Sequence, residues 1–269
     1  MFLRLGPRLP RSSLRRTRDE RRAARSMSTP PGSIFSGKRK RPEAPITLRC
    51  IGFCGADDSV EPGLLAAISA QHSWVEWGVL FREEKAGLPR FASSAWLERL
   101  GKANARRHMK LAAHLCSTRV DEILCGKTDF VKQLHNEMGF RRVQVNATKA
   151  NGVKVDVFAT DAGAARCVAA LRTAFAALPQ VEFIIQRNSE TRPLWERLIV
   201  EPAANMSILF DDSMGLGVST SKWPAPPTSH SLRFGYAGGL SPTNLASKLD
   251  SIESTAVRAM RATPVLVTS

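Results

Sequence analysis

Residues 232–245 read Leu-Arg-Phe-Gly-Tyr-Ala-Gly-Gly-Leu-Ser-Pro-Thr-Asn-Leu, a unit in which a short apolar strand meets a helix at two glycines. Gly238 and Gly239 allow a sharp turn that brings backbone N–H groups close to a ligand. Ser241 is a good N-cap residue, and Pro242 suits the first helical position because its missing N–H would have no partner there. Free N–H groups at the start of a helix attract anions, so this turn is a candidate phosphate site.

Strand-like and helical patterns alternate along the chain from Ile46 onward. Short apolar runs predict eight strands, at Ile46–Cys54, Trp74–Phe81, Met109–Leu115, Arg141–Asn146, Val181–Gln186, Asn205–Asp211, Leu232–Ala237 and Val265–Thr268. Apolar residues that recur at three and four predict helices between them, including Ser93–Arg107, Thr118–Met138, Asp161–Leu178 and Pro242–Met260. A further apolar stretch, Val153–Phe158, lies between the fourth strand and its helix and is either a loop strand or an excursion.

This alternation predicts an α/β fold with parallel strands, and eight strands favour a closed (β/α)₈ TIM barrel. The 224 residues after position 45 fall within the ~200 to 400 that this fold occupies. We expect the barrel to be incomplete at its carboxyl-terminal end, because no helical pattern follows the eighth strand before Ser269. A doubly wound open sheet is the competing architecture.

Positive charge is concentrated in residues 1–45, which hold 13 Lys and Arg against three acidic residues, whereas the remainder holds 26 against 21. Frequent Pro, Ser and Gly predict a disordered Arg-rich tail here, followed by one barrel domain over residues 46–269. A chain that begins at Pro45 should then keep its melting temperature. The tail is either a transit peptide or a non-native extension, since Met27 opens a plausible alternative start.

Composition also narrows the class of protein. No apolar run reaches the length of a membrane span and no secretory signal is present, so we expect no membrane partner and a cytoplasmic location, or a mitochondrial one if residues 1–26 are a transit peptide. Five cysteines without CxxC spacing argue against a disulfide framework and a structural zinc site. No metal-ligand spacing occurs, and no cofactor is expected. Nucleic-acid binding is expected only through the tail, and the oligomeric state stays open.

Chemistry in a barrel of this kind collects at the carboxyl ends of the strands. Six predicted strands end there in polar groups or glycines, namely Cys54 to Asp58, His114 with Cys116, Gln144 with Asn146, Gln186 to Asn188, Asp211 to Ser213, and the two glycines. The period of two puts three pairs of residues each on one face of its strand, namely His114 with Cys116, Gln144 with Asn146, and Gln186 with Asn188. Each residue taken singly fits a packing or capping role, but their coincidence at one end favours a site.

With these residues placed, the chain resembles the phosphoribosylanthranilate isomerase family of tryptophan biosynthesis over about residues 46–245. The matching motifs are Cys54-Gly55, Leu88-Pro-Arg-Phe91, Val143-Gln-Val-Asn146, Leu209-Phe-Asp211, Gly215-Leu-Gly217 with Trp223, and Ala237 to Asn244. The last of these is the most specific. The chain departs from the family at Gly52, where a lysine is usual, and in lacking a clear strand-eight phosphate motif.

The resemblance implies an Amadori rearrangement, in which a ring-closed aminoaldose phosphate becomes its aminoketose. It assigns Cys54 as the general base at sugar C2 and Asp211 as the general acid on the ring oxygen, with Asp212 as the alternative carboxylate. A base at neutral pH requires a pKa of Cys54 below the ordinary thiol value of about 8.5. The substrate-binding residues implied are Arg90 for a carboxylate, Gln144, Asn146, and Gly238 with Gly239 for the phosphate.

Two other classes of function stay open. A catalytically silent barrel that binds a phosphometabolite or a protein partner is favoured by the missing strand-eight motif, and nucleic-acid binding through the tail is the third class. A pocket that contains both Cys54 and Asp211 would favour the enzyme, and their burial apart would favour the silent barrel.

Overall fold

The computed structural model describes residues 2–7, 46–214, 216–218, 220, 222–227 and 232–262. The strands are β1 (Phe2–Pro7), β2 (Ile46–Cys54), β3 (Val75–Phe81), β4 (Lys110–Leu115), β5 (Arg142–Val145), β6 (Glu182–Arg187), β7 (Met206–Phe210) and β8 (Arg233–Ala237). The α-helices are α1 (Pro62–Gln71), α2 (Ser94–Ala103), α3 (Thr118–Leu124), α4 (Asp129–Gln133), α5 (Asp161–Ala177), α6 (Arg192–Leu198) and α7 (Leu245–Ala262). Shorter helical turns are η2 (Glu83–Lys85), the π-helical η3 (Leu134–Met138), η4 (Lys149–Asn151) and η5 (Val155–Phe158).

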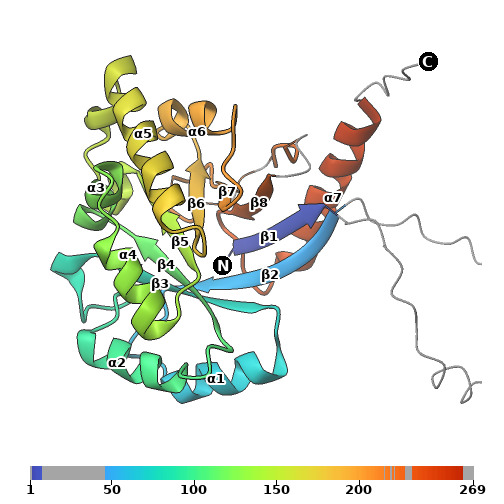
Figure 1. Ribbon diagram of the computed structural model, residues 1–269. Helices are drawn as coiled ribbons and strands as arrows, with labels where there is room; N and C mark the ends of the chain where they lie inside the picture. Colours follow the sequence, from blue (N-terminus) through green and yellow to red (C-terminus); the bar gives the residue numbers. More distant parts are fainter. Residues whose placement is uncertain are drawn as a thin grey trace, which may run out of the picture.

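The strands form a closed barrel in the order in which they occur along the chain. Strands β2 to β8 pair in parallel, and helices lie between successive strands from β2 to β7, on the outside of the ring (Figure 1). The predicted α/β class, with parallel strands and intervening helices, is confirmed. The alternative of a doubly wound open sheet is wrong, because the described strands close on themselves.

The eighth position of the barrel is filled by β1, which is antiparallel to both β2 and β8. The predicted tail therefore needs one correction, since residues 2–7 form a strand. The physical reason is that β2 and β8 each present an unpaired edge of N–H and C=O groups, and a strand between them pairs both edges. Such pairing is made by the main chain and needs little side-chain periodicity. The strand predicted at Val265–Thr268 lies outside the described residues.

Deletion of residues 1–7 should lower the melting temperature by roughly 5 to 10 °C, because the deletion opens two sheet edges at once. This replaces the expectation for a chain that begins at Pro45. Differential scanning calorimetry measures the effect, and deletion of residues 20–26, an equal length of the same basic segment outside β1, serves as the control. Equal melting temperatures for the two deletions would show that β1 does not hold the barrel closed.

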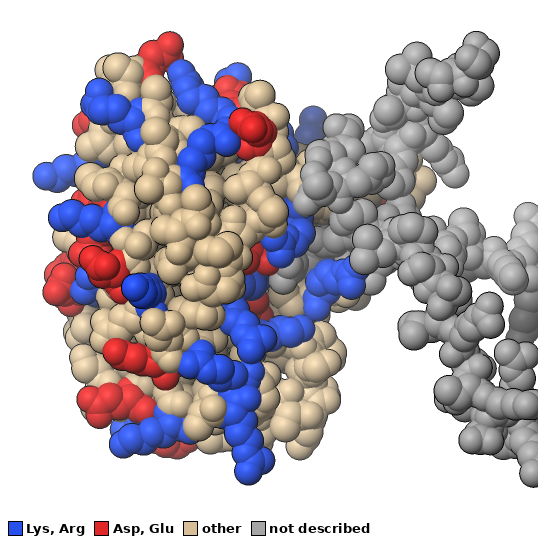
Figure 2. All heavy atoms as spheres, viewed as in Figure 1, with Lys and Arg blue, Asp and Glu red and all other residues tan. Residues whose placement is uncertain are grey.

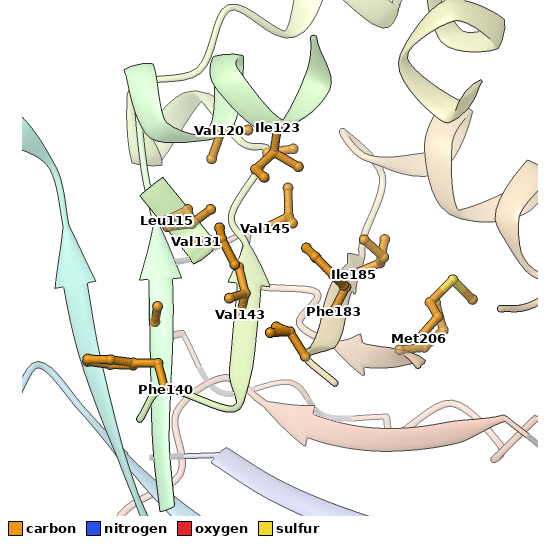
Figure 3. Close-up of a cluster of buried hydrophobic side chains, with 14 of the residues drawn as sticks. Leu115, Val120, Ile123, Val131, Phe140, Val143, Val145, Phe183, Ile185 and Met206 are labelled. Atoms are coloured by element: carbon orange, nitrogen blue, oxygen red, sulfur yellow. The ribbon is translucent and has the colours of Figure 1, made fainter. Parts of the chain in front are cut away.

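The main core lies between the strands and the helices outside them. Strand side chains pack against α3 and α4 in a continuous apolar layer (Figure 3), whose members include Leu115, Val143, Val145, Phe183, Ile185, Val120, Ile123 and Val131. Parallel strands with helices on their outer face are expected to be apolar in this way. No described helix is long and apolar enough to span a membrane.

Three predicted elements differ in detail from the structure. The helix predicted over Thr118–Met138 is divided into α3, α4 and η3, because Gly126 adopts a φ of 79° directly after α3. The last helix starts three residues after Pro242, since residues 242–244 form a turn. Part of the Val153–Phe158 stretch is the 3₁₀ turn η5 and not a strand.

A buried ionic network joins four strands near their amino-terminal ends. Arg142 on β5 donates from Nη1 to Glu76 on β3, and from Nη2 to Oε1 of Glu182 on β6 at 3.1 Å. Arg233 on β8 donates to the second oxygen of Glu182 at 2.9 Å. Glu76, Arg142 and Glu182 are all buried, so each charge depends on its partners for stabilisation.

Surface charge is uneven on the face that carries the outer helices. Figure 2 shows acidic and basic side chains interspersed at the left of the view, whereas Lys and Arg gather toward the lower right. The mildly basic balance of residues 46–269 is therefore not spread evenly over this face.

Candidate functional site

A cavity of about 360 Å³ lies at the carboxyl ends of the parallel strands. All seven predicted site residues line it, namely Cys54, Arg90, Gln144, Asn146, Asp211, Gly238 and Gly239. The structure thus brings together side chains from β2, β5, β7 and β8 and from the loop after β3. Other polar residues that line the cavity are Arg82, Lys85, His114, Cys116, Asn151, Gln186 and Ser213.

Cys54, the last residue of β2, contacts a histidine across the neighbouring strand. Its Sγ lies 3.2 Å from Nδ1 of His114 on β4. Gly78 on β3 makes this contact possible, because a Cβ at that position would lie 2.7 Å from Cε1 and Nε2 of the imidazole. Burial, with smaller contributions from Arg142 and Arg90, lowers the pKa of His114 to about 3. The imidazole is therefore neutral at pH 7.

The thiol of Cys54 is also affected by its burial. Burial raises the pKa of Cys54 above its ordinary value, and the positive charge of Arg90 opposes this effect only in part. Nη2 of Arg90 lies 4.0 Å from Sγ. The prediction of a lowered pKa is wrong for Cys54, because removal from water disfavours the thiolate more than Arg90 favours it.

The position of Arg90 is set by Asp57, which lies in the loop after β2. Asp57 accepts a hydrogen bond from the backbone N–H of Arg90, and its other oxygen accepts from the hydroxyl of Ser59 at 2.6 Å. The bond from that hydroxyl holds the pKa of Asp57 below its usual range, so the side chain is a carboxylate at neutral pH. Glycine suits position 55 beside it, because its φ is 87° and a Cβ there would lie 3.1 Å from Nε of Arg90.

Asp211 follows β7 and is 5% exposed. Its Oδ2 accepts a hydrogen bond from Nε2 of Gln186 at 3.2 Å, and its Oδ1 accepts from the hydroxyl of Ser213. Asp212 is exposed and does not line the cavity. Of the two carboxylates that the sequence left open, Asp211 is therefore the one at the site.

The glycine turn lies beside this carboxylate. Gly238 and Gly239 have φ values of 103° and 60°, which other residues rarely adopt, and a Cβ on Gly238 would lie 3.5 Å from Oδ1 of Asp211. Asn244 closes the turn, because its Nδ2 donates to the carbonyl of Gly239 at 2.8 Å and its Oδ1 accepts from the N–H of Ser241 at 2.9 Å.

The amides on β5 form a hydrogen-bonded chain along the cavity wall. Nε2 of Gln144 donates to Oδ1 of Asn146 at 2.5 Å, and Nδ2 of Asn146 lies 3.7 Å from the sulfur of Cys116. Burial raises the pKa of Cys116 to about 11, so this thiol stays protonated and donates to Oδ1 of Asn151 at 3.5 Å. The predicted pairing of His114 with Cys116, and of Gln144 with Asn146, on one side of each strand agrees with their common place in the cavity. The pairing of Gln186 with Asn188 is wrong, because β6 ends at Arg187 and Oδ1 of Asn188 accepts from the N–H of Thr191 at 3.0 Å, while only Gln186 of the two lines the cavity.

Sequence reasoning missed two cations in the cavity wall. Arg82 directly follows β3, and Nη2 of its side chain approaches Gly152, where a Cβ would lie 2.8 Å away. Lys85 lies in η2 with its ammonium 5.4 Å from the ring centroid of Phe91. Both belong to the loop after β3 that also carries Arg90, so three positive charges from one loop line the cavity. Their place after a strand end was the signal available in the sequence.

Among the residues that the structure describes, no group of three or more His, Cys, Asp and Glu side chains could hold a metal ion.

Comparison with known proteins adds little to this picture. No family model and no curated protein matches the chain. Among solved structures, the GH53 catalytic domain of Ignisphaera aggregans is similar at 14% identity and a TM-score of 0.32, covering 54% of this chain and 51% of that one. The chain therefore spans about half the length of that structure, and a likeness at this level assigns no function.

Proposed function

We propose that the protein is an isomerase of phosphorylated aminosugars and a divergent relative of the phosphoribosylanthranilate isomerase family. Its barrel would be a variant of the (β/α)₈ arrangement in which the antiparallel strand β1 takes the eighth position. The observation that carries the proposal is the presence of Cys54 and Asp211 in one cavity. These residues end strands that lie far apart in the sequence. Burial of the two side chains in separate places would have favoured a barrel without catalysis.

An Amadori rearrangement requires one proton donor and one proton acceptor on the sugar. In its carboxylic acid form Asp211 would protonate the ring oxygen, which opens the C1–O bond and leaves an iminium group and the Asp211 carboxylate. Loss of the C2 proton to Cys54 would then give an enolamine, which tautomerises to the aminoketose. Gln186 and Ser213 orient the carboxyl group of Asp211 for this task.

The charges around the cavity fit a substrate with two anionic ends. Arg90, Arg82 and Lys85 approach from the loop after β3, and the glycine turn after β8 lies beside Asp211. A guanidinium group binds a carboxylate in two parallel hydrogen bonds, and left-handed glycines suit a phosphate. The substrate would therefore place its phosphate at Gly238 and Gly239 and its carboxylate near Arg90.

The direct test is to incubate the full chain with phosphoribosylanthranilate and with related aminoaldose phosphates, and to follow aminoketose formation by NMR. We expect conversion well above the uncatalysed rate for at least one of them. A thermal shift without conversion would support a silent phosphometabolite-binding barrel instead, and the absence of both would refute this use of the cavity.

The glycine turn should bind phosphate, and a pair of variants separates charge from backbone strain. Gly239→Asp adds a negative charge, whereas Gly239→Asn adds a side chain of the same size that tolerates the left-handed conformation without charge. Inorganic phosphate should raise the melting temperature of the parent and, to a smaller extent, of Gly239→Asn, but not of Gly239→Asp. Equal stabilisation of all three proteins would remove the turn from the site.

A further inference from the structure

The contact between Cys54 and His114 is built into the barrel. In the register of the strands Cys54 lies opposite Gly78, and Leu80 on the same strand lies opposite His114. The two side chains meet over Gly78, the one residue type that leaves room for the ring at that place. The separation of 3.2 Å between Sγ and Nδ1 is short enough for direct transfer of the thiol proton.

Charged groups on several neighbouring elements affect the protonation of Cys54 and His114. Arg90 approaches Sγ from the loop after β3, and its charge favours a thiolate. Asp211 on the β7 side acts on Cys54 in the opposite sense, and Arg142 on β5 disfavours a charged imidazole. The neutral pair therefore predominates, and the charged pair is a minor state that the Arg90 guanidinium stabilises at the sulfur.

We propose that His114 is the positioning residue that takes the proton of Cys54, so that the S–H bond breaks, an N–H bond forms at Nδ1 and the electron pair stays on sulfur. The inference deepens the proposed function, since it explains how a buried thiol supplies a thiolate to act as the base. No further reactant is needed, because the proton only moves within the pair.

The proposal has a specific consequence for the pH dependence of thiolate reactivity. The neutral pair and the thiolate–imidazolium pair contain the same number of protons, so the ratio between them does not change with pH. A second thiolate form, in which the imidazole is neutral, increases tenfold for each pH unit, and the charged pair exceeds it only below the pKa of the imidazolium beside the thiolate. That pKa lies above the value of about 3 that applies beside the neutral thiol, because the thiolate attracts the imidazolium. The thiolate population of Cys54 should therefore level off toward pH 5. An isolated thiol instead loses thiolate roughly tenfold for each pH unit below its pKa.

Alkylation by iodoacetamide tests this consequence on the full chain. The rate at Cys54 is measured by peptide mass spectrometry between pH 5 and pH 8, with the exposed Cys125 of the same protein as an internal reference. We expect the rate at Cys54 to level off toward pH 5, whereas the rate at the exposed Cys125 should keep falling as the pH is lowered. In His114→Asn, whose side-chain oxygen can accept the thiol hydrogen bond but cannot take the proton, the rate at Cys54 should regain the tenfold slope.

Two results would overturn the proposal. One is a slope in the parent protein equal to that of Cys125, which needs no variant and so does not depend on whether His114→Asn folds. The other is an absence of reaction at Cys54 over the whole range while Cys125 reacts. The measurement uses no sugar phosphate, so a failure of the isomerisation assay leaves its outcome unaffected.

Discussion

Replacement of Cys54 by Ala, or of Asp211 by Asn, should lower kcat for the proposed isomerisation by roughly 10² to 10⁴, the usual worth of a general acid or base. The binding of a phosphometabolite should stay nearly unchanged, because the charged loop and the glycine turn are left in place. Steady-state kinetics gives kcat, and isothermal titration with the substrate gives the affinity.

Two exposed residues of the same types provide matched controls for these variants. Asp212→Asn changes the exposed carboxylate next to Asp211, and Cys125→Ala removes an exposed thiol. Both should leave kcat within about twofold, as expected for surface positions that the cavity does not include. Full kcat in both Cys54→Ala and Asp211→Asn would show that the acid–base pair proposed here does not operate.

Arg142→Met should destabilise the protein by roughly 3 to 5 kcal/mol, the usual cost of leaving buried charges without their partner. Glu76 and Glu182 would each lose the ion pair with Arg142, whereas the pair of Glu182 with Arg233 would stay. Chemical denaturation followed by circular dichroism measures the free energy of unfolding.

The control for this substitution is Arg192→Met, which breaks an exposed pair with Glu196 on α6 and should cost less than about 0.5 kcal/mol. A triple variant that combines Arg142→Met with Glu76→Gln and Glu182→Gln should recover part of the lost free energy of unfolding. In this variant the two glutamates that lose Arg142 are replaced by neutral side chains. If Arg142→Met costs no more than Arg192→Met, the network does not stabilise the barrel.

The site could be predicted from the sequence because parallel strands expose their carboxyl ends at one edge. Cys54, Asn146 and Asp211 each end a predicted strand, and their meeting requires only that the strands be parallel and closed. The sequence could not decide between Asp211 and Asp212, because successive side chains of a strand point to opposite faces. The end of an apolar run does not show which of the two residues faces the cavity.

Other features depend on groups that the local sequence does not contain. The contact of Cys54 with His114 requires Gly78 on the strand between them, and the raised pKa of Cys54 results from side chains of several strands. Strand β1 was missed because its pairing is made by the main chain, and because its short apolar run is followed by an arginine-rich segment with the composition of a solvated tail.

The position of β1 bears on the order of events during synthesis. Leu5 pairs with both Leu48 and Phe234, so β1 shares one ladder with β2 and another with β8, which is synthesised much later. Contacts between residues so distant in sequence carry a high loop-closure cost and form slowly. The hairpin of β1 with β2 can form early, but the ring must wait until β8 has emerged. Since Cys54 and Gly238 lie on either side of that closing seam, the cavity can take shape only in the final step of folding.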